Sequence, residues 1–254
     1  MSDCLDFTGP EGLRIRGTVL IVPGRGETPV TYRRFGRRMA ADSYRVRVLP
    51  QPLPAQSATD ALSQLGNALI SALSGWEGEL VRPLVLVATD AAAATLAALV
   101  TRGSPDSNWW PDALVLAGLP GYGPHDVDGW ESELDARTHC PAHRGVLTGD
   151  AGIHRGTLST PVEDELLDLA YGSTVNVPHL LLVGGCDPLA DRQSLASAAK
   201  TLPAARLSVV QSAHHDVLND LQHRSVAAEV VTFLEAVRNG TPLQPIVTAE
   251  SSAW

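Results

Sequence analysis

Short apolar runs alternate with longer segments of helical spacing along this chain, and no other sequence feature constrains the fold as tightly. Strands buried on both faces of a parallel sheet read as continuous apolar runs, and each needs a crossover, usually a helix, before the next. We expect strands at 18–22, 45–49, 84–87, 113–117, 179–183 and 207–210. We expect helices at 30–41, 57–73, from Asp90 onward, and at 191–202 and 226–237. The alternation predicts an α/β fold, a mostly parallel sheet covered by helices on both faces. Alternating polar residues at 45–49 place that strand nearer an exposed edge.

The segment 120–176 interrupts this pattern. It is rich in Gly, Pro, His and Asp, and its one clear helical stretch lies at 163–169. The total length of 254 residues suits one large α/β domain better than two small ones. We therefore expect a core formed by 1–119 and 177–254, with 120–176 inserted as a short cap, or lid.

The charge balance limits the partners that suit this chain. The formal net charge is −9 and the pI is about 5.3. Nucleic-acid binding needs a concentrated basic face, so the acidity argues against a nucleic-acid partner. The densest basic run, at 33–38, lies in a predicted helix. It is typical of a solvated helix face, and an anion-binding patch is the alternative.

Three cysteines, Cys4, Cys140 and Cys186, are far apart and form neither a disulfide framework nor a metal-ligand spacing. His139 and His143 flank Cys140 but lack a further ligand, so we expect no metal. The first residues lack the basic start and apolar run of a signal peptide, and no long apolar stretch predicts a membrane span. These features favour a cytoplasmic protein.

Candidate functional residues follow the predicted strands, where a parallel sheet places its ligand crevice. Two glycines in 23–27 permit a tight turn that offers N–H groups to an oxyanion. Asp90 lies where a strand meets a helix, flanked by small residues, as in the elbow that carries a nucleophile. Its alternative role is the N-cap of an alanine-rich helix. Asp187 lies in a turn after a strand, and His214 and His215 follow the last strand.

The order nucleophile, acid, histidine is that of the α/β-hydrolases. The Pro-Gly-Arg-Gly-Glu run at 23–27, with Tyr32, resembles the oxyanion turn of the lysophospholipase-like branch, which includes serine aminopeptidases and monoacylglycerol lipases. The Cys-Asp-Pro-Leu run at 186–189 resembles the acid turn of that branch, and 215–220 resembles its histidine turn. The resemblance spans roughly residues 18 to 237.

The resemblance implies a role for each matched position. Asp90 takes the nucleophile position in place of serine, Asp187 orients the histidine, and His215 is the base. The oxyanion hole would be formed by the backbone N–H groups of Arg25 and Ala91.

An aspartate in this position is suited to attack a saturated carbon, because attack on an ester carbonyl would give an anhydride. The resulting alkyl ester would be hydrolysed by water that His215 activates, as in epoxide hydrolases and haloalkane dehalogenases. Ala91 replaces the halide-binding tryptophan of the dehalogenases. Tyr122 and Tyr171 in the insertion are candidates for the two cap tyrosines of the epoxide hydrolases.

Two alternatives stay open. Carboxylates on both sides of His215 favour the imidazolium, which suits acid–base chemistry in a lyase, dehydratase or cyclase, for example in secondary metabolism. The second alternative is a catalytically inactive binding protein in which Asp90 only caps a helix.

The short cap predicts a small, largely apolar substrate bound between cap and sheet. Arg25 would favour a carboxylate or enolate on it. No cofactor is implied, and the sequence leaves the oligomeric state open. Beyond the triad and the oxyanion hole, the expected pocket residues are Gly24, Tyr122, Trp130, Tyr171 and His214.

Overall fold

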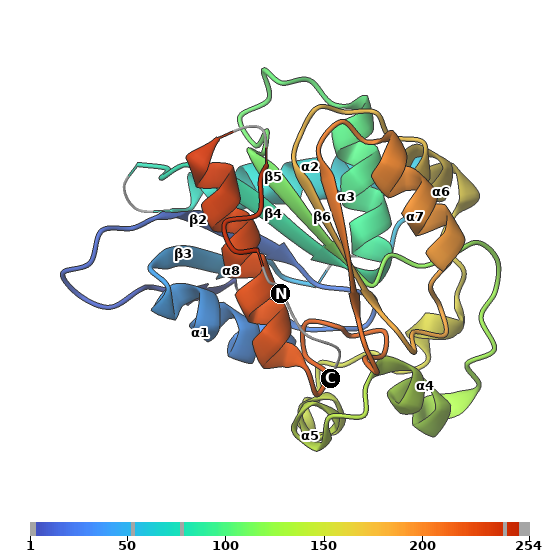
Figure 1. The fold of residues 1–254 in the computed structure, drawn as a ribbon. Coiled ribbons are helices and arrows are strands. Elements are labelled where there is room, and N and C mark those ends of the chain that lie inside the picture. Colours follow the sequence, from blue (N-terminus) through green and yellow to red (C-terminus); the bar gives the residue numbers. More distant parts are fainter. Residues whose placement is uncertain (1–3, 52–53, 77–78, 241–242, 249–254) are drawn as a thin grey trace.

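A seven-stranded sheet forms the centre of the molecule in the computed structural model, which describes residues 4–51, 54–76, 79–240 and 243–248 (Figure 1). Its strand order is β1-β3-β2-β4-β5-β6-β7. All neighbouring strands are parallel except β1, which is antiparallel to β3. The strands are β1 (Leu5–Phe7), β2 (Gly17–Val22), β3 (Tyr44–Val48), β4 (Leu84–Thr89), β5 (Ala113–Ala117), β6 (His179–Gly184) and β7 (Ala205–Val210). The predicted α/β class is confirmed.

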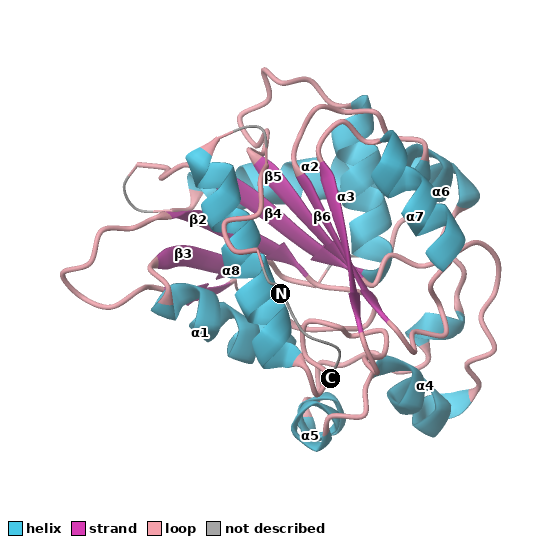
Figure 2. Cartoon of the chain, viewed as in Figure 1, coloured by secondary structure: helices cyan, strands magenta, loops and turns pink. Residues whose placement is uncertain are grey.

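Helices cover both faces of this sheet (Figure 2). One face of the sheet is covered by α1 (Arg33–Ala41) and α8 (His223–Asn239), which pack on the strand side chains of that face. The 3-10 turn η1 (Pro29–Tyr32) directly precedes α1. The other face is covered by α2 (Ala58–Ser74), α3 (Asp90–Arg102), α6 (Asp164–Tyr171) and α7 (Arg192–Thr201). Each predicted helix is present, within a few residues of its expected bounds. Over the residues described, no helix combines the length and apolarity needed to cross a membrane.

Residues 45–49 lie near the edge of the sheet, as expected, but they do not form the edge itself. The short strand β1 pairs outside β3, with Asp6 opposite Arg47. Arg47 is only 8% exposed and donates to both carboxylate oxygens of Asp6. The polar residue Arg47 of β3 is therefore explained by an ion pair between its buried guanidinium and the exposed carboxylate of Asp6. A three-residue strand is too short to produce a periodic signal of its own.

The inserted segment contains more helix than its sequence predicts. Besides α6 it forms α4 (Gly129–Arg137), α5 (Pro141–Gly149) and the 3-10 turn η2 (Thr157–Ser159). The inner face of α4 carries the charged residues Glu133 and Arg137, both almost fully buried, which removes the apolar periodicity that reveals a helix. The predicted helix α6 packs on α3 and joins the core above the sheet, whereas α4 and α5 lie beyond the carboxyl ends of the strands.

Candidate active site

Asp90 occupies a sharp turn between β4 and α3. Its φ is +52°, a left-handed conformation that Asp adopts more readily than most residues but that still carries strain. The turn lies against Gly24, where an added Cβ would stand 3.0 Å from the Asp90 Cβ and 2.9 Å from Glu27 Oε2. Thr89 is the N-cap residue of α3. The 3%-exposed Asp90 side chain instead bonds to residues from other strand ends, so the helix-cap interpretation does not describe its contacts.

The three residues predicted as a triad lie in hydrogen-bond contact. His215 Nε2 is 3.1 Å from Asp90 Oδ1, and His215 Nδ1 is 3.1 Å from both carboxylate oxygens of Asp187. All three side chains are buried. Asp187 is fixed in turn by the Leu189 N–H, which donates to its Oδ1 at 2.9 Å. A carboxylate, an imidazole and a second carboxylate therefore form one continuous chain.

Arg25 binds Asp90 with both its backbone and its side chain. The Arg25 N–H donates to Asp90 Oδ2 at 2.9 Å, Nε donates to the same oxygen at 2.8 Å, and Nη2 donates to Oδ1 at 2.6 Å. Arg25 Nη1 also donates to the carbonyl of Thr160, after η2. The amide expected in the oxyanion hole thus holds an oxygen of Asp90 itself. Ala91 follows in the first turn of α3, where a backbone N–H has no acceptor within the helix.

Charges in this cluster set the protonation of the triad. Burial alone would raise the pKa of Asp90, but the charge and hydrogen bonds of Arg25, and then those of His215, hold it well below its usual range. Burial opposes protonation of His215, yet Asp187 and Asp90 outweigh it and raise its pKa to about 10. The site at neutral pH therefore holds an anionic Asp90 beside a cationic His215.

A second buried polar cluster supports the turn that carries Arg25. Arg137 Nη2 donates to the Arg25 carbonyl at 2.7 Å and to Glu133 Oε1 at 2.9 Å. Arg137 Nη1 lies 3.4 Å from Asp216 Oδ1 and 3.8 Å from Glu27 Oε1. Burial would lower the pKa of Arg137, but Asp216, Glu27 and Glu133 raise it above its usual value. One guanidinium thus connects α4, the turn that carries Arg25 and the turn that carries His215.

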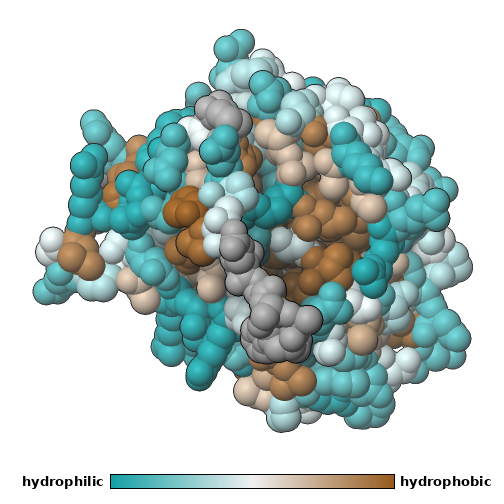
Figure 3. Space-filling model, in the orientation of Figure 1, coloured by the Kyte–Doolittle hydropathy of each residue, from teal (hydrophilic) through white to brown (hydrophobic). Residues whose placement is uncertain are grey.

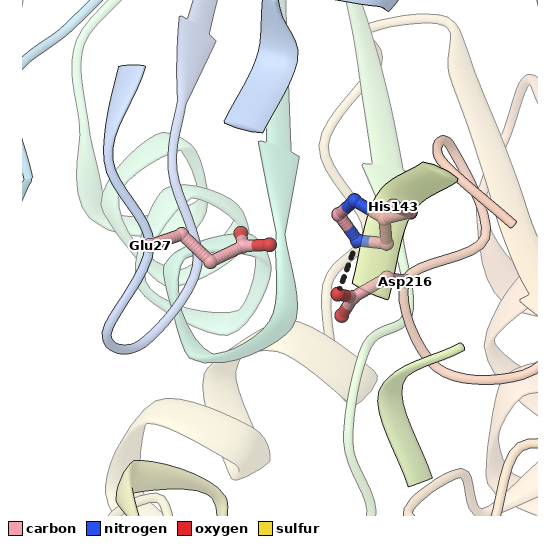
Figure 4. A group of neighbouring side chains, drawn as sticks. All are labelled: Glu27, His143 and Asp216. Carbon is pink, nitrogen blue, oxygen red and sulfur yellow. Dashed lines mark hydrogen bonds and ion pairs between the residues drawn. The ribbon is translucent and has the colours of Figure 1, made fainter. Parts of the chain in front are cut away.

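Glu27, His143 and Asp216 bring three possible metal-ligand atoms within 4.8 Å of one another (Figure 4). The His143 Nε2 is 2.8 Å from Asp216 Oδ2, and Glu27 points toward this pair from the opposite side. The guanidinium of Arg137 already supplies positive charge to both carboxylates. Repulsion by this fixed cation makes the group a poor metal site, and we propose no metal here.

The remaining pocket candidates lie in varied settings. The Tyr122 hydroxyl donates to Asp168 and that of Tyr171 donates to the Pro120 carbonyl, with the two rings stacked. Trp130 packs with apolar residues of the cap under Arg155. His214 bonds to Asp220 and contacts the ring of His139 at a tilt, so it does not join the triad. Neither tyrosine hydroxyl is bonded to Asp90.

Two residues near the triad escaped sequence analysis. His125 has a buried Nε2 without a hydrogen-bond partner. Burial and the nearby cations Arg25 and His215 lower its pKa. Arg137 reaches from α4 to the carbonyl of Arg25. Neither residue follows a strand or belongs to a motif, so only the fold could reveal them.

Comparison with known proteins relates this architecture to lipases and esterases of known structure. A monoacylglycerol lipase from Paleococcus ferrophilus superposes with a TM-score of 0.70 at 16% identity, covering 92% of this chain and 98% of the other. A monoglyceride lipase from Saccharomyces cerevisiae superposes with a TM-score of 0.71 at 12% identity, covering 92% of this chain and 91% of the other. The carboxylesterase CesB from Bacillus subtilis superposes with a TM-score of 0.63 at 14% identity, covering 91% of this chain and 86% of the other. No protein-family model and no curated protein matches the sequence. The chain has the α/β-hydrolase fold.

Proposed function

We propose that this chain is an enzyme that hydrolyses a small, largely apolar electrophile, such as an epoxide or a compound with a carbon–halogen bond, through Asp90, His215 and Asp187. One observation carries the proposal. Asp90 occupies the strained strand-to-helix turn with one oxygen on the Arg25 amide and the other on His215 Nε2. A nucleophile needs both a partner that transfers protons and donors for the charge that later develops on it.

In the first step Asp90 Oδ1 attacks a saturated carbon, and the bond from that carbon to the leaving group breaks. Oδ1 must first part from Arg25 Nη2 and His215 Nε2, which both bond to it. A leaving oxygen takes the proton from His215 Nε2. A halide departs as the anion, and on that route His215 releases its proton to solvent before the second step. The product of this step is an alkyl ester on Asp90.

In the second step His215 acts as the base. Ester formation removes the Asp90 charge, one of the two carboxylate charges that raise the His215 pKa. Neutral His215 takes a proton from water as the hydroxide attacks Asp90 Cγ, and the Arg25 N–H stabilises the charge that develops on Oδ2. Collapse releases the product alkoxide, which takes the proton of the restored carboxyl group. Asp90 is again anionic and His215 protonated.

Trapping the ester tests this proposal. In His215→Gln the first step still forms the ester with a halide leaving group, and the second step lacks its base. Intact-protein mass spectrometry after incubation with a 1-bromoalkane should show one added alkyl group. Peptide mapping should place it on Asp90, and His215→Gln/Asp90→Ala should remain unmodified. An adduct that persists in the double variant would refute the assignment.

Acid–base chemistry in a lyase, dehydratase or cyclase is the second candidate, because each oxygen of Asp90 already accepts two hydrogen bonds. An anion held this firmly is a weak nucleophile, and the protonated His215 is an acid. This candidate predicts that no adduct forms, while Asp90→Ala still abolishes turnover. A binding protein of this fold would keep its ligand affinity in both Asp90→Ala and His215→Ala.

A further inference from the structure

The basic helix α1 forms one wall of a pocket of about 770 Å³ that is separate from the triad. Its lining includes Arg33, Arg34, Arg37 and Arg38 from α1, and His143 from α5. None of its lining residues belongs to the triad. Figure 3 shows strongly hydrophilic residues over the part of the surface where α1 lies.

These four arginines form no ion pair with any carboxylate in the described part of the chain, although the protein carries a net charge of −9. Arg34 donates to the Asn219 carbonyl and, at 3.5 Å, to Cys140 Sγ, both neutral acceptors. The lining contains one carboxylate, Asp42, which the structure does not pair with any of them.

The arrangement costs α1 stability. Arg33 and Arg37, like Arg34 and Arg38, are four residues apart, a spacing at which like charges repel on a helix. The first turn of α1 holds two arginines and no acidic residue, so positive side chains face the positive end of the helix dipole. A bound anion would relieve both penalties.

The pocket wall also holds unused hydrogen-bonding capacity. Thr31 Oγ1 and Asn219 Oδ1, both from residues that line the pocket, are buried without a partner. The Thr31 hydroxyl can donate to an anion, as the guanidinium groups do. Val30 and Val146 add apolar surface beside these donors.

From this geometry we propose that the α1 pocket binds a small molecule carrying a phosphate or pyrophosphate group. Guanidinium groups match phosphate oxygens with paired hydrogen bonds. A single carboxylate would neutralise only one of four adjacent cations, whereas a phosphate or pyrophosphate carries more charge. The pocket volume lies in the range that holds an organic ligand, so the group would be part of a larger molecule with an apolar portion against Val30 and Val146.

Titration calorimetry with inorganic pyrophosphate tests the site on the full chain. Arg37→Gln/Arg38→Gln should weaken pyrophosphate binding by about tenfold or more. The matched control, Arg14→Gln/Arg192→Gln, removes the same charge at two exposed arginines outside the pocket and should change affinity less than about twofold. Equal loss in both variants would show nonspecific attraction and overturn the site, as would the absence of binding by the wild type.

Vesicle flotation then identifies the source of the phosphate group. Binding of pyrophosphate without binding to phosphatidic acid in phosphatidylcholine vesicles supports a soluble ligand. Vesicle binding that Arg37→Gln/Arg38→Gln abolishes supports the same pocket with a lipid headgroup as the source. Vesicle binding that this variant leaves unchanged would place phosphate recognition elsewhere and contradict the proposal.

Discussion

At the scale of single residues, the conformation of Asp90 depends on space that neighbouring residues leave free. Its positive φ turns the carboxylate away from α3 and toward Arg25 and His215. That orientation is possible because Gly24 lets the turn at 23–27 approach the Asp90 Cβ closely. The glycine therefore serves close packing, since its own φ does not lie in the left-handed region.

Replacing Gly24 tests this packing. In Gly24→Ala the new methyl carbon would meet Glu27 Oε2, Asp90 Cβ and Thr89 Oγ1 at 2.9 to 3.1 Å. We expect a loss of about 1–3 kcal/mol in the free energy of unfolding, measured by urea denaturation, together with reduced turnover. Gly66→Ala is the matched control, because its added Cβ meets no atom within 4 Å apart from the adjacent backbone of its own helix. The substitution should stabilise α2 by about 0.5–1 kcal/mol. Equal stability of Gly24→Ala and wild type would contradict this view of the turn.

The sequence predicted which residues meet at the site better than it predicted how they bond. Asp90, Asp187 and His215 each follow a strand, and parallel strands bring those ends to one edge of the sheet. The side chain of Arg25 is different, because its orientation depends on packing that no local pattern encodes. Only the structure therefore reveals that Arg25 binds the Asp90 carboxylate with three donors.

At the scale of elements, α4 of the inserted segment supports the candidate active site through charge. Its residues Glu133 and Arg137 are buried, and Arg137 reaches the carbonyl of Arg25. The amphipathic helices α1 and α2 were predictable because their buried residues are apolar. A helix that buries charged side chains looks polar all round, so α4 gave no such signal.

Removing the buried guanidinium tests this role of α4. Arg137→Met leaves Glu133 and Asp216 buried without their cation, which should cost about 3–5 kcal/mol of unfolding free energy. Arg144→Met, the matched control, removes an arginine whose partners Glu131 and Asp135 are exposed, and should cost at most about 1 kcal/mol. Thermal and urea unfolding of both variants make the comparison.

A positioning role for Arg137 also predicts an effect beyond stability. At a temperature where Arg137→Met is folded, turnover should fall more than the Michaelis constant rises, because the Arg25 amide would be held less firmly. Arg137→Lys keeps the charge without the planar fork and should restore stability more than turnover. Full turnover in folded Arg137→Met would restrict the residue to a structural role.

At the scale of the whole molecule, the buried ionisable groups together determine how stability depends on pH. Three aspartates have a pKa below the usual 3.8 although burial alone would raise it. Arg25 lowers the pKa of Asp90, and Arg137 lowers that of Asp216. The His214 N–H lowers the pKa of Asp220. A carboxyl group whose pKa is lower in the folded protein than in the unfolded chain stabilises the folded state when the pH is above its unfolded-state pKa. That stabilisation is lost as the pH falls below the unfolded-state pKa. Stability should therefore decline below about pH 4.

Stability should also decline as the pH rises, because of groups whose pKa is raised in the folded protein. Burial and the charge of Asp216 raise the pKa of Glu27 from 4.5 to about 7, and the carboxylates around His215 raise its pKa from 6.5 to about 10 against the effect of burial. Each group contributes its full stabilisation when the pH is below its pKa in the unfolded chain. That stabilisation is lost as the pH rises through the pKa of the group in the folded protein. The free energy of unfolding should thus be highest near pH 4–5, fall toward pH 7 and fall again toward pH 10. Urea unfolding across this range should show the second decline weakened in His215→Gln and the first weakened in Glu27→Gln. A maximum near pH 8 would mean that these buried clusters do not govern the stability of the molecule.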